Sequence, residues 1–350
     1  MPLPHLQTLD TLTATILIDN DLDPISPIPP DTVDITNGLI RTLATSSPHG
    51  VHDRGDAHKE LRMEDICCAA HGVSILVTAT KDGQQHSVLF DAGPEGGVWE
   101  GNVRRLGLQA ESVEVVMLSH WHRDHSGGLT RAIELITEAK KASGSSAPTI
   151  VDLHPDRPEY RGMAIGKEII SLQADPTFEE IEHAGGEIRK EAEGHTILDD
   201  FFYISGEIPR RTTYETGLKG GMRFEKDQDE NEEEGDWFSD EIIADERFLM
   251  CNLKGKGIVM FTACSHAGVV NCARHAVKLL DDVPLHAIIG GFHLATSEAA
   301  QMESTVQDLK KLDPAVILPG HCTGWRAKFA IERQMPGAMV PCSVGMRIKF

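Results

Sequence analysis

The sequence predicts a layered α/β protein, and three observations support this prediction. The 350 residues are 40% hydrophobic and 25% charged, which is enough apolar material for a sizeable core. Strand-like and helix-like segments alternate along the chain. Four strand-like segments run into clusters that contain a histidine, namely His120, His266, His293 and His321. Because strand ends at one edge of a sheet form the ligand site in such proteins, we expect these histidines to converge.

The first half of the chain contains four predicted strands and two predicted helices. Residues 11–18 are rich in β-branched side chains and predict a strand. Residues 73–79 and 86–90 predict a hairpin around Asp82-Gly83. Residues 113–118 are nearly all apolar, as in a strand covered on both faces. Residues 98–106 and 129–141 are predicted helices, the latter from its apolar spacing.

The second half repeats the alternation after an irregular region. We expect strands at 257–262, 285–289 and 315–318, separated by helices at 269–280 and 297–312. The whole chain, residues 1–350, is predicted to form one domain. Two parts depart from regular patterning: an N-terminal segment at 19–66 and an insertion around 152–245. The acidic run at 227–236 within the insertion is typical of a solvated surface loop.

Charge and cysteine content limit the class of protein. Lys and Arg number 33 against 54 Asp and Glu, so the formal net charge is −21. Such an acidic surface argues against nucleic-acid or membrane partners and leaves a small-molecule substrate. The seven cysteines show no C-x-x-C pair, which favours free thiols. Without a secretory signal or an apolar run near the roughly 20 residues of a membrane helix, a cytoplasmic location is expected.

One short segment carries most of the chemistry. His120-Trp121-His122-Arg123-Asp124-His125 places four potential metal ligands within six residues, directly after an apolar strand. A tight loop after such a strand can turn these side chains toward one point. Imidazole nitrogens and carboxylate oxygens suit zinc, iron and manganese. The segment therefore predicts a transition-metal site.

These residues resemble the metallo-β-lactamase superfamily, whose central signature is H-x-H-x-D-H. Phe90-Asp91-Ala92-Gly93 and Pro319-Gly320-His321 resemble its early and late motifs. One branch of the superfamily, named for the archaeal dihydropterin aminobenzene-phosphate synthase, is similar at four further segments: 205–210, 262–268, 290–294 and 321–324. The resemblance implies a four-layer αβ/βα sandwich with metals at one edge, between two sheets.

The resemblance also implies which residues bind metal. His120 and His122 would hold a first divalent ion, and Asp124, His125 and His321 a second. The third ligand of the first ion is His266 or, as the alternative, His195 in a Gly-His pair. Zinc is expected in both positions, with iron or manganese as alternatives. Asp91 is expected to support the ligand loop through hydrogen bonds without contacting metal.

Three further positions depart from the family pattern or extend it. No Gly-Asp that could bridge two metals occurs between residues 257 and 321. Cys264 could bridge as a thiolate or be an inert buried thiol, so the second metal could be weakly held or absent. Arg210 could clamp a substrate carboxylate or phosphate, or be a surface arginine. His293 could bind substrate by a hydrogen bond, or be structural.

The chemistry that this site predicts is hydrolysis. A divalent metal lowers the pKa of bound water toward about 7, and Asp124 could accept its proton. We expect a metallohydrolase with a dinuclear centre that acts on a lactone, lactam, ester, thioester or phosphoester. A synthase-like transferase joining a pterin diphosphate to an aminobenzene ribosyl phosphate is one alternative. A non-catalytic metal-binding sensor is another, whereas the acidic charge argues against a nuclease.

Overall fold

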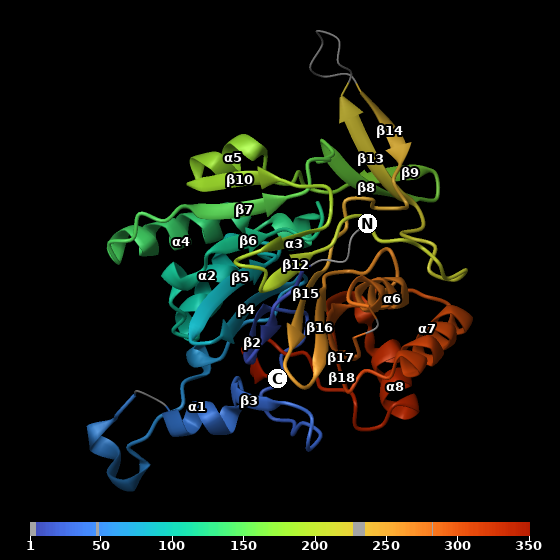
Figure 1. Ribbon diagram of the computed structural model, residues 1–350. Helices are drawn as coiled ribbons and strands as arrows, with labels where there is room; N and C mark the ends of the chain where they lie inside the picture. Colours follow the sequence, from blue (N-terminus) through green and yellow to red (C-terminus); the bar gives the residue numbers. More distant parts are fainter. Residues whose placement is uncertain (1–4, 47–48, 227–234, 282) are drawn as a thin grey trace.

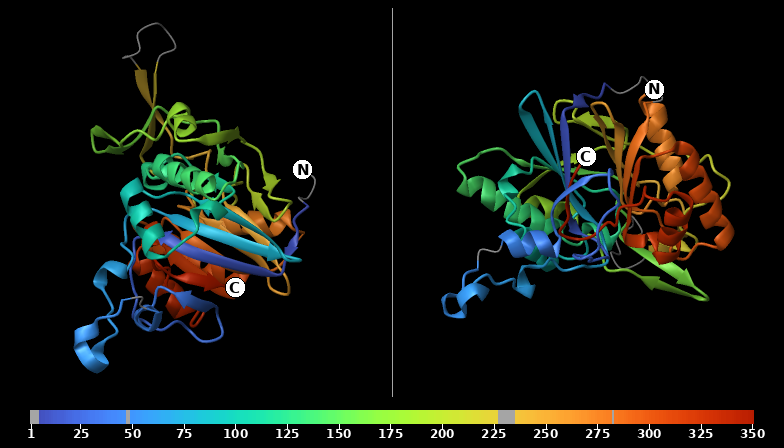
Figure 2. Two further views of the ribbon diagram at one scale, coloured as in Figure 1. Left: turned by 90° about the vertical axis from the view of Figure 1, so that its left-hand side faces the viewer. Right: turned by 90° about the horizontal axis from the view of Figure 1, so that it is seen from below.

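Two β-sheets face each other and carry helices on their outer sides (Figures 1 and 2). The computed structural model describes residues 5–46, 49–226, 235–281 and 283–350. Helix, sheet, sheet and helix form four layers, which is the predicted αβ/βα sandwich. Within the described residues, no helix is both long and apolar enough to span a bilayer.

The first sheet has eight strands in the order β10-β7-β6-β5-β4-β2-β19-β3. Helices α2 (Gly96–Arg105), α4 (Leu129–Ala142) and α5 (Phe178–His183) cover its outer face through a cluster that includes Trp99, Ile133 and Ile181. In chain order, the strands are β2 (Thr11–Ile18), β3 (Asp34–Asn37), β4 (Ser74–Lys81), β5 (Gln84–Phe90), β6 (Val115–Met117), β7 (Thr149–Leu153), β10 (Gly186–Lys190) and β19 (Arg347–Lys349).

The second sheet has the order β11-β12-β15-β16-β17-β18, with β1 beside β15. Helices α6 (Val269–Leu279), α7 (Ala299–Leu312) and α8 (Trp325–Gln334) pack on its outer face. Its strands are β1 (Thr8–Leu9), β11 (His195–Ile197), β12 (Phe202–Ile204), β15 (Leu249–Leu253), β16 (Gly257–Thr262), β17 (Leu285–Gly291) and β18 (Val316–Gly320).

The central core lies between the two sheets and explains the apolar runs of the sequence. In β16, Val259 and Phe261 point into this core, whereas Ile258 and Met260 pack under the helices. Both faces of the strand are therefore buried, and the strand needs apolar residues at every position. The same reasoning applies to β6, where Val115 faces the central core and Val116 the helices.

The region around 152–245, expected to be an insertion, contributes strands to all three sheets. Strand β10 joins the first sheet, and β11 and β12 join the second. Only a separate four-stranded sheet, in the order β14-β13-β8-β9, stands apart from both. Its strands are β8 (Tyr160–Ile165), β9 (Glu168–Ser171), β13 (Gly221–Lys226) and β14 (Gly235–Ser239). Most of the acidic run, residues 227–234, lies outside the described residues.

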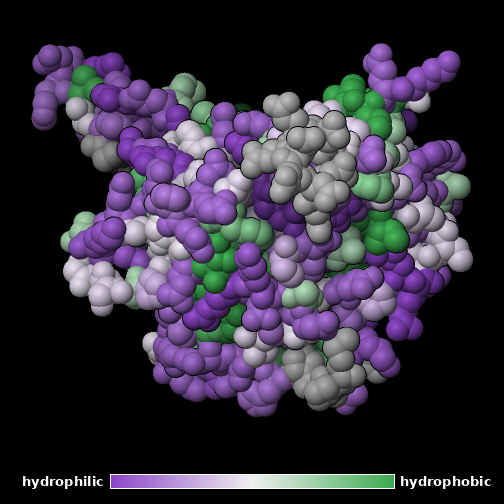
Figure 3. Space-filling model, turned by 90° about the horizontal axis from the view of Figure 1, so that it is seen from above, coloured by the Kyte–Doolittle hydropathy of each residue, from purple (hydrophilic) through white to green (hydrophobic). Residues whose placement is uncertain are grey.

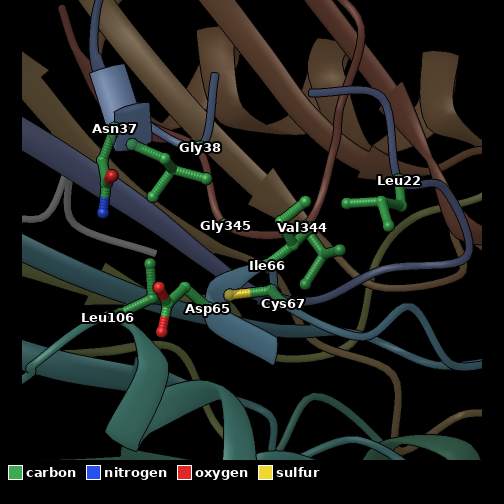
Figure 4. Close-up of a pocket in the computed structure, with 10 residues that line it drawn as sticks. Leu22, Asn37, Gly38, Asp65, Ile66, Cys67, Leu106, Val344 and Gly345 are labelled. Atoms are coloured by element: carbon green, nitrogen blue, oxygen red, sulfur yellow. The ribbon is translucent and has the colours of Figure 1, made fainter. Parts of the chain in front are cut away.

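The N-terminal segment 19–66 also holds regular structure. Besides β3 it contains helix α1 (Ile40–Ser46) and two short 3₁₀ turns, η1 (His52–Ala57) and η2 (Met63–Asp65). A small pocket lies between this segment and the loop before β19, lined among others by Leu22, Cys67 and Val344 (Figure 4). Burial raises the pKa of the Cys67 thiol to about 11, so this cysteine stays protonated and unreactive.

The molecular surface is mainly hydrophilic, as the net charge requires. The face seen from above shows hydrophilic side chains around smaller apolar patches (Figure 3). Exposed apolar side chains on the small sheet include Ile165, Ile170 and Phe238.

Candidate metal centre

The candidate ligands come from strand ends at one edge of both sheets. His120 follows β6, and the one-turn helix α3 (Arg123–Ser126) carries Asp124 and His125. Cys264 and His266 follow β16, whereas His321 follows β18 and opens the 3₁₀ turn η4 (His321–Thr323). Strands β5 and β6, and likewise β16, β17 and β18, are parallel, so their ends meet at this edge.

Backbone conformation at this edge is unusual. Asp91, Ser265, His293 and His321 have left-handed backbones, with φ of 58°, 58°, 48° and 45°. Non-glycine residues rarely adopt this conformation, and it concentrates at functional sites. Here the four residues lie in the loops that follow strands at this edge.

Three imidazoles form the first ligand group. Nδ1 of His122 lies 2.9 Å from Nε2 of His120 and 3.2 Å from Nε2 of His266. All three side chains are buried. His266 occupies the third position, whereas its rival His195 lies in β11, where its Nε2 contacts Asp152 at 2.8 Å. The structure therefore brings together His120, His122 and His266, and not His195.

The second ligand group consists of Asp124, His125 and His321. Oδ2 of Asp124 lies 3.3 Å from Nε2 of His321 and 3.6 Å from Nε2 of His125. Asp124 is the exposed member, with 25% of its side chain accessible, whereas both histidine side chains are fully buried. Solvent thus reaches this group on the Asp124 side.

Cys264 belongs to both groups. Its Sγ lies 3.2 Å from Nε2 of His125 and 3.3 Å from Nε2 of His321. The same sulfur clusters with the ring nitrogens of His120 and His266, with all three ligand atoms within 4.8 Å of one another. A thiolate at this position can contact ions held by either group. Cys264 is therefore placed to contact ions of both groups, as a bridging ligand would be.

Hydrogen bonds on the outer side of the rings show that the site fits a cation. Ser119 Oγ donates to Asp91 and so accepts from Nδ1–H of His120, which leaves Nε2 of His120 as an inward lone pair. Nδ1 of His125 donates to Asp91 at 2.8 Å, with the same result. Several inward lone pairs facing one another repel unless a cation lies between them. The residues present therefore fit divalent metal ions.

Asp91 organises the ligand loop. Its carboxylate accepts hydrogen bonds from Ser119 N at 2.7 Å, Ser119 Oγ at 2.8 Å and His125 Nδ1. The side chain is fully buried. Asp91 thus sets the orientation of two ligand histidines without being one of the clustered ligand groups.

Three consecutive charged residues support both ligand loops, and sequence reasoning missed them. Asp245 accepts from Trp121 N, Glu246 accepts from His266 N and Ala267 N, and Arg247 donates to Leu118 O. Exposure of these three residues is at most 2%. Burial raises the pKa of Glu246 to about 7. A run of Asp-Glu-Arg normally indicates a surface loop, so the sequence offered no signal for this role.

The two expected substrate residues lie beside the first ligand group. The ring centroid of His293 is 4.5 Å from that of His266, and its buried Nδ1 has no hydrogen-bond partner within the described parts of the chain. Arg210 donates through Nη2 to Ile242 O, and its guanidinium lowers the pKa of Glu246. His293 therefore reaches the ligand cluster, whereas Arg210 bonds to the backbone of Ile242 and acts on Glu246 through its charge.

Electrostatics favour neutral imidazoles in the first ligand group. Burial lowers the pKa of His120, His122 and His266, to about 3 for His122. In the second group burial opposes the charged form, but Asp124 and Asp91 raise the pKa of His125, and Cys322 and Asp124 raise that of His321. Burial alone would raise the pKa of Asp124, but His125 and His321 bring it well below its usual value. Burial raises the pKa of the Cys264 thiol, so metal binding there must displace a proton.

The apoprotein should lose stability in acid because of the first ligand group. An unfolded histidine titrates near pH 6.5, so between pH 6.5 and 3 the unfolded chain binds more protons than the folded one. The contribution of these histidines to the free energy of unfolding is therefore highest above pH 6.5. Below pH 6.5 it falls by about 1.4 kcal/mol per pH unit for each such histidine. Urea unfolding of chelator-treated protein should show this slope, and His122→Asn should reduce it. An equal slope in the variant would contradict the assignment.

Comparison with known proteins agrees with this geometry. Residues 70–210 match the model of the metallo-β-lactamase superfamily, a stretch that includes the whole H-x-H-x-D-H segment. A solved metal-dependent hydrolase of the β-lactamase superfamily superposes with a TM-score of 0.63 and 21% identity, covering 96% of this chain and 98% of that one. Residues 70–210 thus match a metallo-β-lactamase domain, and the chain has the metallo-β-lactamase fold.

Two proteins of Methanocaldococcus jannaschii are similar in sequence to this chain. A protein named 7,8-dihydropterin-6-methyl-4-(β-D-ribofuranosyl)-aminobenzene-5′-phosphate synthase is 27% identical over 281 residues, covering 80% of this chain and 90% of its own. An uncharacterized protein is 28% identical over 263 residues, covering 74% of this chain and 86% of its own. The chain is thus similar to a protein of the branch that its motifs indicated.

Proposed function

We propose that this metallo-β-lactamase-fold chain is a metal-dependent hydrolase of a small organic molecule, with two divalent ions held by the two ligand groups. The observation that carries the proposal is the convergence of five imidazoles, Asp124 and Cys264 on one buried point. Imidazole and thiolate ligands favour zinc for both positions, with iron and manganese as alternatives. Bound divalent ions would supply Lewis acidity and a hydroxide-like nucleophile at neutral pH.

The residues of the chain have separate tasks in this proposal. His120, His122 and His266 would hold one ion, His125, His321 and Asp124 the other, and Cys264 would contact both. The low pKa of Asp124 makes it a weak base. We therefore assign it to orienting the attacking water by accepting a hydrogen bond, in addition to binding metal. The buried rings exclude solvent from the remaining sides of the site.

The proposed substrate is a lactone, lactam, ester, thioester or phosphoester. Free cysteines throughout, at all seven positions, support a reducing cytoplasmic location. The acidic chain supports a small-molecule partner over nucleic acid or membrane.

Chelation should abolish the activity. We expect purified protein to hydrolyse at least one member of a panel containing a lactone, a lactam, a thioester and bis(4-nitrophenyl) phosphate. Removal of metal by dialysis against a chelator should reduce that rate by on the order of 10²-fold or more, because both Lewis acidity and the activated water are lost. Zinc, iron or manganese should restore it. Hydrolysis that survives complete chelation would contradict the proposal.

A synthase-like transferase is the second candidate. The 27% identity to the archaeal synthase over 80% of this chain favours it. The discriminating experiment incubates metal-loaded protein with a dihydropterin diphosphate and an aminobenzene ribosyl phosphate, and looks for the joined product by mass spectrometry. Formation of the conjugate would favour the transferase. Release of free pterin alone would favour hydrolysis.

A further inference from the structure

The open side of the metal centre is bordered by His71, a residue that none of the ligand motifs includes. His71 precedes β4, and 70% of its side chain is exposed. Its Nε2 lies 3.6 Å from Oδ2 of Asp124, and its ring centroid lies 4.8 Å from that of His321. Asp124 is the solvent-facing ligand of its group, and the exposed His71 lies beside it.

Asn20 determines which ring nitrogen carries the proton in the neutral forms of His71 and His321. The backbone N–H of Gly72 must donate, so the Asn20 atom at 3.2 Å is the carbonyl Oδ1. The amide nitrogen Nδ2 therefore donates to Nδ1 of His71 at 2.9 Å. A neutral His71 ring then carries its proton on Nε2, the atom that faces Asp124.

The same amide acts on His321 in the opposite sense. Oδ1 of Asn20 lies 3.0 Å from Nδ1 of His321, which donates to it. When the ring is neutral, Nε2 of His321 is therefore the unprotonated nitrogen, and it faces Cys264 and Asp124. One side chain thus prepares His321 as a ligand and His71 as a donor.

Gly72 makes this arrangement possible. A Cβ atom at position 72 would lie 2.1 Å from the carbonyl oxygen of Asp124. Only glycine allows the segment before β4 to pass so close to the ligand loop, and His71 is placed beside Asp124 as a result.

We propose that His71 is a substrate-contacting residue, which donates a hydrogen bond from Nε2 to an oxyanion of the substrate, such as a phosphoryl oxygen, and that Asn20 is its positioning residue. Among the residues that the structure describes, none offers the Nε2–H group an acceptor within hydrogen-bond distance, since 3.6 Å to Asp124 is too long. The role of this contact in catalysis rests on the proposed hydrolase function, whereas the contact itself is tested by binding alone.

The test measures binding of inorganic phosphate to zinc-loaded protein by calorimetry. His71→Phe and His71→Asn should weaken binding by roughly 10-fold or more, because a hydrogen bond to a charged group is lost. His71→Gln should stay within about 3-fold of the wild type, since its amide reaches the place of Nε2. Zinc content should be unchanged in all three variants. Asn20→Ala should lower both phosphate and zinc affinity, because His321 loses its acceptor.

A second readout is independent of binding. Nitrogen-15 spectra of the zinc-loaded protein should show His71 protonated at Nε2 and unprotonated at Nδ1. The proposal is overturned by the opposite tautomer, by wild-type protein that binds no phosphate, or by His71→Phe that binds phosphate normally. It is also overturned if His71→Phe loses zinc as Asn20→Ala does. Failure of the hydrolase proposal would appear instead as zinc-loaded wild type that binds phosphate and turns over no substrate.

Discussion

Replacement of Cys264 by alanine is expected to lower the metal content from two equivalents to one or fewer and to reduce hydrolysis by on the order of 10²-fold or more. The reason is its position: the sulfur lies within 3.3 Å of two imidazole nitrogens of one ligand group and beside the other group. An inert buried thiol would instead affect stability alone. Metal analysis and initial rates on the panel of substrates separate the two.

Cys251 provides the matched control for this experiment. It is a fully buried free cysteine of β15 that packs in the central core. Cys251→Ala removes the same atoms and should lower stability without changing metal content per folded chain. Two equivalents retained in Cys264→Ala would show that this cysteine does not bridge, whatever its effect on unfolding.

Replacement of Asp91 by alanine should be the most destabilising change that removes no metal ligand. It would leave Ser119 N, Ser119 Oγ and Nδ1–H of His125 without their acceptor in a fully buried place. Breaking a buried charged network of this kind costs about 3–5 kcal/mol of unfolding free energy. Metal affinity should fall by roughly 10- to 100-fold, because the ligand rings lose their orientation. Denaturant unfolding and metal titration measure the two effects.

Asp91→Asn distinguishes orientation from packing. The amide keeps the shape and one acceptor oxygen, which can still serve Ser119 N, but its nitrogen cannot accept from His125. We therefore expect a smaller loss of stability than in Asp91→Ala, together with a similar loss of metal affinity. Unchanged metal affinity in both variants would show that metal binding does not depend on the hydrogen bonds of Asp91 to His125 and, through Ser119, to His120.

The sequence predicted those strands that are buried on both faces of a sheet. Strands β2 and β16 have the predicted bounds, because apolar or β-branched residues fill them from end to end. Strand β10 was missed, since it carries the polar sequence Gly-Glu-Ile-Arg-Lys and pairs with β7 at the edge of the sheet. Edge strands need few apolar residues, so periodicity cannot find them.

The candidate site was predictable where its residues cluster along the chain. H-x-H-x-D-H was visible from local spacing, and His266 and His321 from their places at strand ends. Asn20 was missed because its partners, His71 and His321, are 51 and 301 positions away. The supporting run Asp245-Glu246-Arg247 was missed because its charges are buried only through contacts with distant loops. Such pairings follow from the packed fold and leave no local pattern.

The most direct measurement is the metal content per chain, by plasma mass spectrometry, of protein purified without chelator, with His122→Ala as the comparison. His122 Nδ1 lies between His120 and His266, so its loss should empty the first ligand group. The account predicts close to two equivalents in the wild type and one or fewer in the variant. A single equivalent in the wild type would contradict the dinuclear centre, and no transition metal after reconstitution would contradict the metallohydrolase itself.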